Sequence, residues 1–138
     1  MPNNLPPRGI RNNNPGNVRA NPNVMWQHQS GVDGEGFIVF NDPVYGIRCL
    51  CMVFRHYVEY DGLTTLRQMI DRWAPPVEND TGAYVEDVAR YVNADPDAPY
   101  DIHANSLALC KAIILHENGE CPYSEGQLLR GIHLSHIQ

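Results

Sequence analysis

An apolar stripe through residues 43–60 constrains the fold of this chain more strongly than any other stretch. Its members recur at helical spacing: Val44, Ile47, Cys51, Phe54 and Val58. Asp42 and Pro43 ahead of the stripe are a typical helix start, and Asp61-Gly62 ends the run. A long helix with one apolar face gains most of its stability by burying that face, so residues 43–60 are predicted to form the core helix.

Other segments show helical or hairpin patterns around this element. Four further helices are predicted at 63–73, 84–92, 107–117 and 124–132. The first carries an apolar stripe that includes Trp73, and Ser124 with Gln127 forms a capping box at the start of the last. Residues 31–40, which read GVDGEGFIVF, are a candidate strand or β-hairpin. The fold class predicted is therefore α+β and mostly α-helical, with a small N-terminal lobe of loops and a hairpin. The length of 138 residues suits one domain, 1–138, in which residues 1–8 are expected to be a flexible arm.

Charge and composition argue against several classes of function. The chain carries 16 acidic and 10 basic residues, a net charge of −6, and has no run of Lys and Arg, so nucleic acid is not expected as a partner. No stretch approaches 18 apolar residues and the N-terminus has no signal pattern, so neither membrane insertion nor an export address is expected. The cysteines lack CxxC spacing and the histidines form no HExxH motif, so no metal, cofactor or structural disulfide is expected.

Glu117 is the first candidate for a catalytic residue. The predicted helix 107–117 carries one apolar stripe: Leu107, Cys110 and Ile114. Glu117 occupies the next position on that stripe, and Asn118-Gly119 then stops the helix. Partial burial disfavours the charged form of a carboxyl, which suits a general acid. The alternative is that Glu117 ends the stripe at the edge of the core and turns out to water.

An asparagine-rich run near the N-terminus is the second candidate site. Residues 12–17 read NNNPGN, and a helix is excluded there because Pro15 and Gly16 break it, so the run predicts a turn. Arg19 and Trp26 follow. Ordered amides near an indole suit sugar binding, because amides hydrogen-bond hydroxyl groups and the indole face stacks on a sugar ring. The alternative is a flexible arm.

Glu78 lies between Pro76 and the entry to the helix 84–92. Its carboxylate either stabilises this loop by accepting hydrogen bonds from backbone amides or takes part in the site. The first role is favoured, because carboxylates beside helix starts commonly act as cap partners.

Three stretches carry a resemblance to known proteins: GIRNNNPGNVR (9–19), RWAPPVENDTGAYVEDVARYV (72–92) and AIILHENGECPYSEGQLLRGI (112–132). Together they resemble a group of phage and prophage virion-associated proteins with a lysozyme-like, peptidoglycan-lytic fold. The resemblance spans about residues 8–134. It implies a protein of the phage virion, made in the host cytoplasm and acting in the periplasm or cell wall. The partners implied are peptidoglycan glycan strands and other phage virion proteins.

A weaker similarity links the chain to flagellar-rod muramidases and glucosaminidases, in circularly permuted order. It rests on the run 13–19, Trp26, the acidic hairpin and the strand before the helix 43–60, while helix 107–117 stands in for the family's glutamate helix. This order predicts that residues 13–18 lie next to residues 112–118. The similarity implies that Glu117 is the catalytic acid and that Asp33 or Glu35 is the second carboxylate. Two departures are Asn118 in place of a serine and Trp26-Gln27-His28 in place of a Trp-x-Gly turn.

The function that these similarities imply is a muramidase or a lytic transglycosylase that cleaves the glycan strand of the cell wall. The candidate substrate-binding residues are Asn13, Asn14, Asn17, Arg19, Trp26, Glu78, Tyr84 and Tyr123. The alternative is a non-catalytic virion structural or host-binding protein that retains a lysozyme-like fold.

Overall fold

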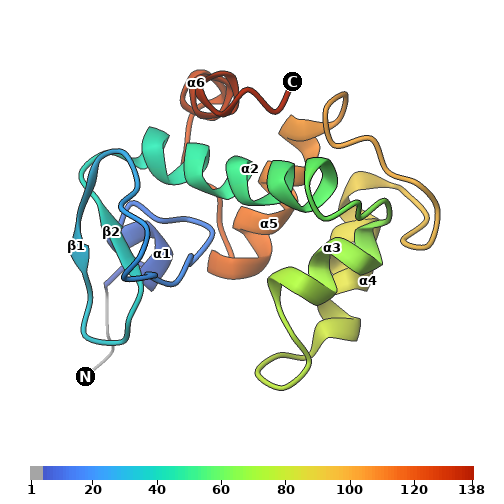
Figure 1. The fold of residues 1–138 in the computed structure, drawn as a ribbon, viewed down its shortest axis with the longest axis horizontal. Helices are drawn as coiled ribbons and strands as arrows, with labels where there is room; N and C mark the ends of the chain where they lie inside the picture. Colours follow the sequence, from blue (N-terminus) through green and yellow to red (C-terminus); the bar gives the residue numbers. More distant parts are fainter. Residues whose placement is uncertain (1–4) are drawn as a thin grey trace.

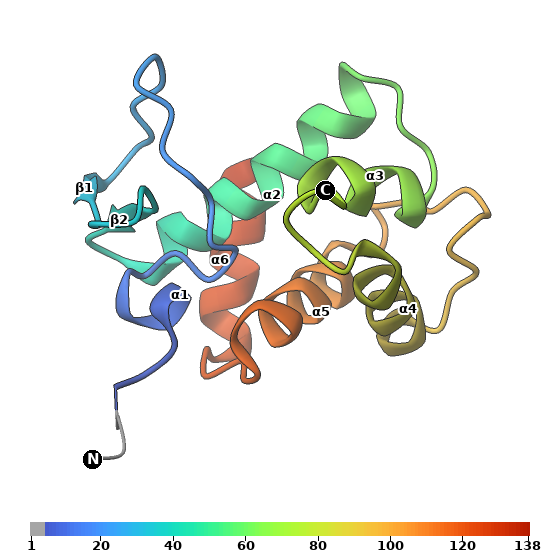
Figure 2. The same ribbon diagram turned by 90° about the horizontal axis from the view of Figure 1, so that it is seen from below.

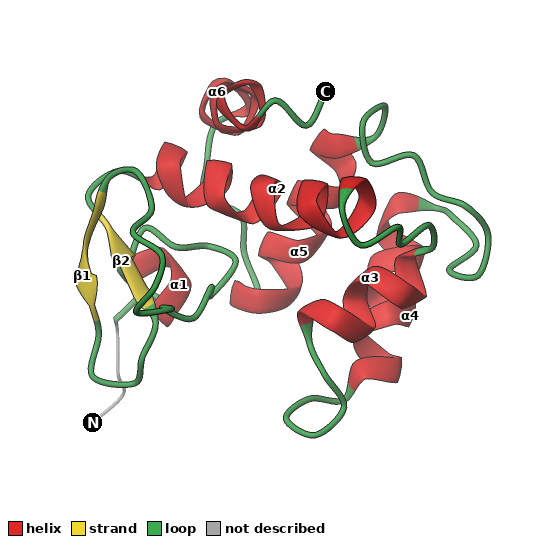
Figure 3. Ribbon diagram, viewed as in Figure 1, coloured by secondary structure: helices red, strands yellow, loops and turns green. Residues whose placement is uncertain are grey.

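The computed structural model describes residues 5–138 and shows a mostly helical α+β fold, as the sequence patterns predict (Figures 1 and 3). The elements in chain order are α1 (Arg8–Arg11), β1 (Gln29–Val32), β2 (Ile38–Phe40), α2 (Pro43–Glu59), α3 (Leu66–Trp73), α4 (Thr81–Val92), α5 (Ser106–Asn118) and α6 (Glu125–Ser135). In Figure 1 the small lobe, α1 with the β1–β2 hairpin, lies at one end, and α3 with α4 lies at the other. Helices α2 and α5 run between the two ends.

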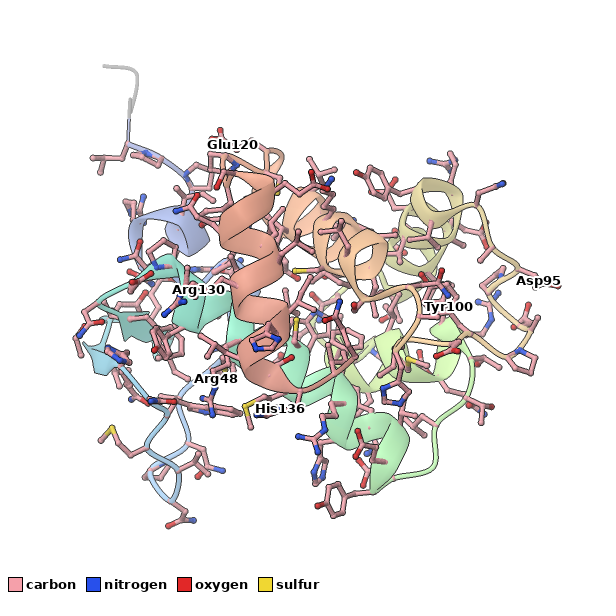
Figure 4. All side chains as sticks on the ribbon, turned by 90° about the horizontal axis from the view of Figure 1, so that it is seen from above. Arg48, Asp95, Tyr100, Glu120, Arg130 and His136 are labelled. Carbon is pink, nitrogen blue, oxygen red and sulfur yellow. The ribbon has the colours of Figure 1, made fainter. Side chains whose placement is uncertain are left out.

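Helix α2 is the core helix, as its apolar stripe predicts. Asp42 accepts a hydrogen bond from the Val44 amide at 2.9 Å and Pro43 occupies the first turn, so the helix starts where the sequence indicates. Its buried face packs on α5 and α6. Helix α6 lies across α2 (Figure 4). Their approach is close because Gly131 has no side chain; a Cβ there would lie 2.6 Å from Ile47 Cγ2.

Helices α3, α4 and α6 begin at capping side chains, and α5 ends before a glycine. Thr65 with Gln68 forms a capping box on α3, and Ser124 with Gln127 forms the predicted one on α6. Helix α4 begins after Asp80, whose side chain accepts a hydrogen bond from the Ala83 amide. Helix α5 ends at Asn118, and Gly119 follows in the left-handed conformation with φ 74°, so the predicted stop is confirmed.

The small lobe is built from α1, the predicted turn at 12–17 and a two-stranded antiparallel hairpin. Asn13 and Asn17 both adopt positive φ, 53° and 50°, which asparagine tolerates better than most residues. The expected flexible arm at 1–8 is wrong at Arg8, which begins α1 and pairs with Glu35 at 3.1 Å. Residues 1–4 of that arm lie outside the described part of the chain.

The described residues contain neither a membrane-spanning helix nor a cluster of metal-ligand side chains. Within residues 5–138, no helix has both the length and the apolar character needed to cross a membrane. In the same range, no group of three or more His, Cys, Asp and Glu side chains is arranged to hold a metal ion.

Candidate active site

A cleft of about 540 Å³ separates the small lobe from the helical lobe. Residues of both lobes line it, among them Arg8, Asn17, Arg19, Trp73, Glu78 and Glu117. The turn after α1 brings the small lobe against α2 and the C-terminal end of α5 (Figure 2). The cleft is therefore assembled from segments that are far apart in the sequence.

Glu117 is half-buried where the two lobes meet, and hydrogen-bond donors from both sides hold its carboxylate. Asn17 Nδ2 donates to Oε1 at 2.9 Å from the small lobe. Tyr84 Oη donates to Oε2 at 2.8 Å from α4. An ionised carboxylate offers about four acceptor positions, so positions remain for exchanging a proton with a bound molecule. The helix end is therefore part of a built site, in contrast to the solvated cap that was the alternative reading.

A chain of two donors, half-buried Trp73 and buried Tyr84, orients this carboxylate. Trp73 Nε1 donates to Tyr84 Oη at 3.0 Å, and Tyr84 Oη in turn donates to Glu117. Burial, and then the negative charge of Glu117, raise the pKa of Tyr84, so its hydroxyl stays protonated and remains a donor. On its other side the Tyr84 ring stacks on His116, which pairs with Asp87 at 2.9 Å.

The contact between the N-terminal turn and the Glu117 helix confirms a prediction from the order of the matched segments. Asn17 and Glu117 are bonded although 100 positions separate them. One residue further along α5, Asn118 Nδ2 donates to the Pro15 carbonyl at 2.8 Å. A Cβ on Gly9 would clash with the Asn118 side-chain oxygen, so α1 can lie this close to α5 because Gly9 has no side chain.

The small-lobe rim of the cleft is cationic. Arg8 and Arg19 both line the cleft and both place their guanidinium carbons over the Phe37 ring, at 3.8 and 4.5 Å from its centroid. Arg8 also pairs with Glu35. Arg19 makes a weak contact with the Glu35 carbonyl at 3.5 Å.

Glu78 lies on the helical wall of the cleft beside Asn79 and Pro75. Its backbone amide donates to the Pro75 carbonyl, which shapes the turn before α4. The role of helix cap that its position in the sequence favoured belongs to Asp80 instead, whose carboxylate reaches the Ala83 amide. The exposed Glu78 carboxylate is therefore available to the cleft.

The two carboxylates expected to assist Glu117 lie outside the cleft, so this part of the prediction is corrected. Asp33 accepts hydrogen bonds from the amides of Glu35 and Phe37, both at 2.9 Å, and from Asn12 Nδ2. The Phe37 amide, followed by Asn12, lowers the pKa of Asp33, which acts as the anchor of the hairpin turn. Glu35 projects into solvent, with 71% of its side chain exposed, and pairs with Arg8.

Two of the three asparagines predicted to bind substrate serve the fold. Asn14 is fully buried; its Nδ2 donates to the Val18 and Ile38 carbonyls, and its Oδ1 accepts from the Val18 amide. Asn13 donates to the Phe40 carbonyl at 3.0 Å. These amides bond the backbone because a buried turn leaves carbonyl groups that need donors. Asn17 remains the asparagine that reaches the cleft.

Three aromatic residues also occupy positions other than the expected ones. Trp26 packs in the small lobe against the cluster of Ile38, Phe40 and Cys49 and does not line the cleft. Tyr123 packs on the edge of the main core, and burial raises its pKa to about 12. Tyr84 is 2% exposed, so it positions Glu117 and does not contact the open cleft.

Most residues that line the cleft were not among the candidates predicted from the sequence; they include Arg8, Phe37, Tyr57 and Trp73. Arg8 lay in the segment expected to be an arm. Trp73 was counted as a member of an apolar stripe, and its partly buried position is consistent with that pattern. For two of them the resemblance carried a signal, because the matched stretch 9–19 begins next to Arg8 and the stretch 72–92 contains Trp73.

The comparison with known proteins places the chain among phage proteins. No family model matches it. Over 127 residues it is 33% identical to Protein P5 of Pseudoalteromonas phage PM2, and the match covers 90% of this chain and 79% of that protein. The match therefore takes in both walls of the cleft and the hairpin. At this identity and coverage, the chain belongs to the same family as phage protein P5.

Proposed function

We propose that the chain is a virion-associated peptidoglycan hydrolase with a lysozyme-like domain, in which Glu117 is the general acid. The observation that carries the proposal is the position of Glu117: a half-buried carboxylate at a helix end, held from both lobes and open to a cleft of about 540 Å³. Membership of a phage family supports a place in the virion. Action in the periplasm or cell wall follows from the proposed substrate.

The chemistry asked of Glu117 is proton donation to a glycosidic oxygen as an oxocarbenium-like sugar develops. Tyr84 and Asn17 hold the carboxyl group by donating to it, and its remaining lone-pair positions can carry the proton that Glu117 donates to the glycosidic oxygen. In hydrolysis a second carboxylate assists a water molecule. Glu78 is the candidate for that role, because it lines the same cleft whereas Asp33 and Glu35 do not.

The same arrangement serves lytic transglycosylation. Glu117, after giving up its proton, would then take one from the 6-hydroxyl of muramic acid. The 6-oxygen attacks the anomeric carbon of the same sugar and forms an anhydro sugar. No second carboxylate is required in that case. The products distinguish the two reactions: hydrolysis yields reducing muramic acid ends, and transglycosylation yields anhydro ends.

The circular permutation is supported by the packing of the matched segments. The muramidase-like order places the glutamate helix ahead of the turn, hairpin and long helix. In this chain α5 lies at the other end of the sequence, yet it contacts the turn at 15–17. Moving α5 ahead of α1 in the chain order would preserve these contacts.

A non-catalytic virion protein with this fold is the second candidate. The observation that favours it is the loss of both expected assisting acids, since Asp33 anchors a turn and Glu35 pairs with Arg8. This protein would bind glycan in the cleft without turnover.

A clearing assay on purified cell walls tests the proposal, with Glu117→Gln as the decisive variant. We expect the wild type to clear the walls and Glu117→Gln to be slower by roughly 10² or more, the loss typical of a missing general acid. Glu120→Gln is the matched control, because Glu120 is exposed, lies just beyond α5 and does not line the cleft (Figure 4). A wild type that binds walls and never clears them would support the second candidate.

A further inference from the structure

The cleft carries a charge pattern that general acid catalysis alone does not explain. Its helical wall holds Glu117 and Glu78, while its small-lobe rim holds Arg8 and Arg19. A neutral polysaccharide would need hydroxyl-binding groups and a stacking surface, and two guanidinium groups at the rim would contribute little to it. Resting on the proposed function, we infer that Arg8 and Arg19 form a subsite for a carboxylate of the substrate strand, so that the enzyme selects an acidic glycan.

The geometry of the arginines favours this use. Both guanidinium groups lie against the Phe37 ring, which holds the two cations on one platform at the edge of the cleft. Arg19 is exposed, and its hydrogen bond within the described chain is a 3.5 Å contact, so most of its five N–H donors are free to bind a ligand. A planar guanidinium matches a carboxylate with two parallel hydrogen bonds.

Glu35 shows that this rim accepts a carboxylate. Its Oε2 lies 3.1 Å from Arg8 Nη1, while 71% of its side chain is exposed. An exposed ion pair of this kind contributes little to stability and breaks easily. Glu35 therefore competes for Arg8 with a substrate carboxylate, which would displace it. This role differs from the catalytic role expected for Glu35.

The overall charge strengthens the requirement for such a subsite. With a net charge of −6 the protein repels an acidic polymer at long range, so binding needs a local cationic site. Two carboxylates of peptidoglycan have the required chemistry: the lactyl group of muramic acid, once its peptide has been removed, and the acidic groups of the peptide itself. Both are carboxylates next to the glycan strand.

Binding measurements with the Glu117→Gln protein test the inference without turnover. Three soluble probes separate the sources: N-acetylglucosamine hexamer, which is neutral; peptidoglycan oligomers stripped of peptide; and the same oligomers with their peptides. We expect at least one acidic probe to bind roughly tenfold tighter than the neutral hexamer, the effect of one good charge-assisted hydrogen-bonded pair. The acidic probe that shows the preference identifies the source of the carboxylate.

Four further substitutions in the same background assign the preference to the rim. Arg19→Gln should abolish the preference, measured as the ratio of the affinities for the acidic and the neutral probe, and Arg19→Lys should keep part of it. Arg8→Gln should weaken it as well. Glu35→Gln should strengthen binding of the acidic probe a few-fold, roughly, by freeing Arg8. The matched control is Arg11→Gln, which removes one exposed positive charge from α1 outside the cleft and should leave every affinity unchanged.

Three results would overturn the inference. Equal affinity for neutral and acidic probes, or a preference that survives both Arg19→Gln and Arg8→Gln, would show that the rim does not select carboxylates. Binding of none of the probes would also overturn it. Wall clearing by the wild type is measured separately, so a catalytic enzyme with no carboxylate preference can be told apart from a protein with no activity.

Discussion

The two walls of the cleft are held together by different interactions. The helical wall is packed around a large apolar cluster that includes Phe54, Met69 and Ile113, each at most 1% exposed. The small lobe contributes two residues, Ile38 and Phe40, to a small buried cluster that is completed by Cys49 of α2. Side-chain amides of Asn13 and Asn14 bond the backbone within that lobe.

This difference explains why the chemical groups lie where they do. In the helical wall, burial of apolar area leaves polar groups such as Glu78 and Glu117 free for the cleft. In the small lobe the polar side chains form hydrogen bonds to the backbone that hold the fold, so Asn13, Asn14 and Asp33 are not available to a ligand. A polar residue in the small lobe is therefore more often structural than functional.

Removal of the buried Asn14 side-chain amide should have the largest effect on the free energy of unfolding. Asn14→Ala loses three hydrogen bonds and leaves buried partners unpaired, so we expect it to destabilise the protein by roughly 2–4 kcal/mol in urea unfolding. Asn23→Ala, an exposed asparagine of the same lobe, should change the free energy of unfolding by less than about 0.5 kcal/mol. Similar small effects for both would mean that the small lobe does not depend on its amides.

The next effect concerns the residue that positions Glu117. Tyr84→Phe removes one donor to Glu117 and leaves Trp73 Nε1 without its acceptor. We expect wall clearing per folded molecule to fall roughly tenfold, mainly in kcat, and the free energy of unfolding to fall by about 1–2 kcal/mol. Tyr91→Phe, on the exposed face of the same helix, is the control. If Tyr84→Phe lowers stability alone, Tyr84 is a core residue and does not act on the site.

Alkaline pH should weaken the helical wall. Burial raises the pKa of Tyr57 to about 12 from its ordinary value of 10.0. Below pH 10 the tyrosine is neutral in both states; above it the unfolded chain ionises first, so stability falls as pH rises toward 12.

Between pH 9 and 11 the wild type should lose about 1 kcal/mol more stability than Tyr57→Phe, after allowance for partial exposure. The exposed Tyr60→Phe should follow the wild type. Parallel curves for the wild type and Tyr57→Phe would show that the ring is not buried as described.

The smallest effects are expected for substitutions of two acidic residues that are two positions apart, Glu78 and Asp80. Asp80→Ala should cost about 1 kcal/mol, the usual value for a lost helix cap, because Asp80 accepts from the Ala83 amide. Glu78→Gln should leave thermal stability unchanged and slow wall clearing if hydrolysis is the reaction. Thermal melting and clearing on both variants check this. A large loss of stability in Glu78→Gln, with normal melting of Asp80→Ala, would show that Glu78 stabilises the loop before α4.

Local sequence patterns were sufficient for most of the architecture. The stripe on α2, the capping box on α6 and the stop at Gly119 each depend on residues within one or two turns of one another, and each is confirmed. The turn at 12–17 is also confirmed, because Pro15 and Gly16 exclude a helix without any help from distant residues. The placement of Glu117 at an inward-facing helix end belongs to the same class.

The tertiary structure decided which polar groups the fold consumes. Asn14 and Asn17 look alike in the sequence, yet Asn14 bonds a carbonyl 24 positions away, and Asn17 reaches a carboxylate 100 positions away. Asp33 and Glu78 are both acidic loop residues, but Asp33 accepts from amides two and four positions further along the same turn, whereas only the tertiary arrangement brings Glu78 to the cleft. Helical periodicity and caps are short-range properties that a sequence displays directly. The partner of a long-range side-chain hydrogen bond, such as that of Asn17 with Glu117, is set by how distant segments pack, and no local pattern records it.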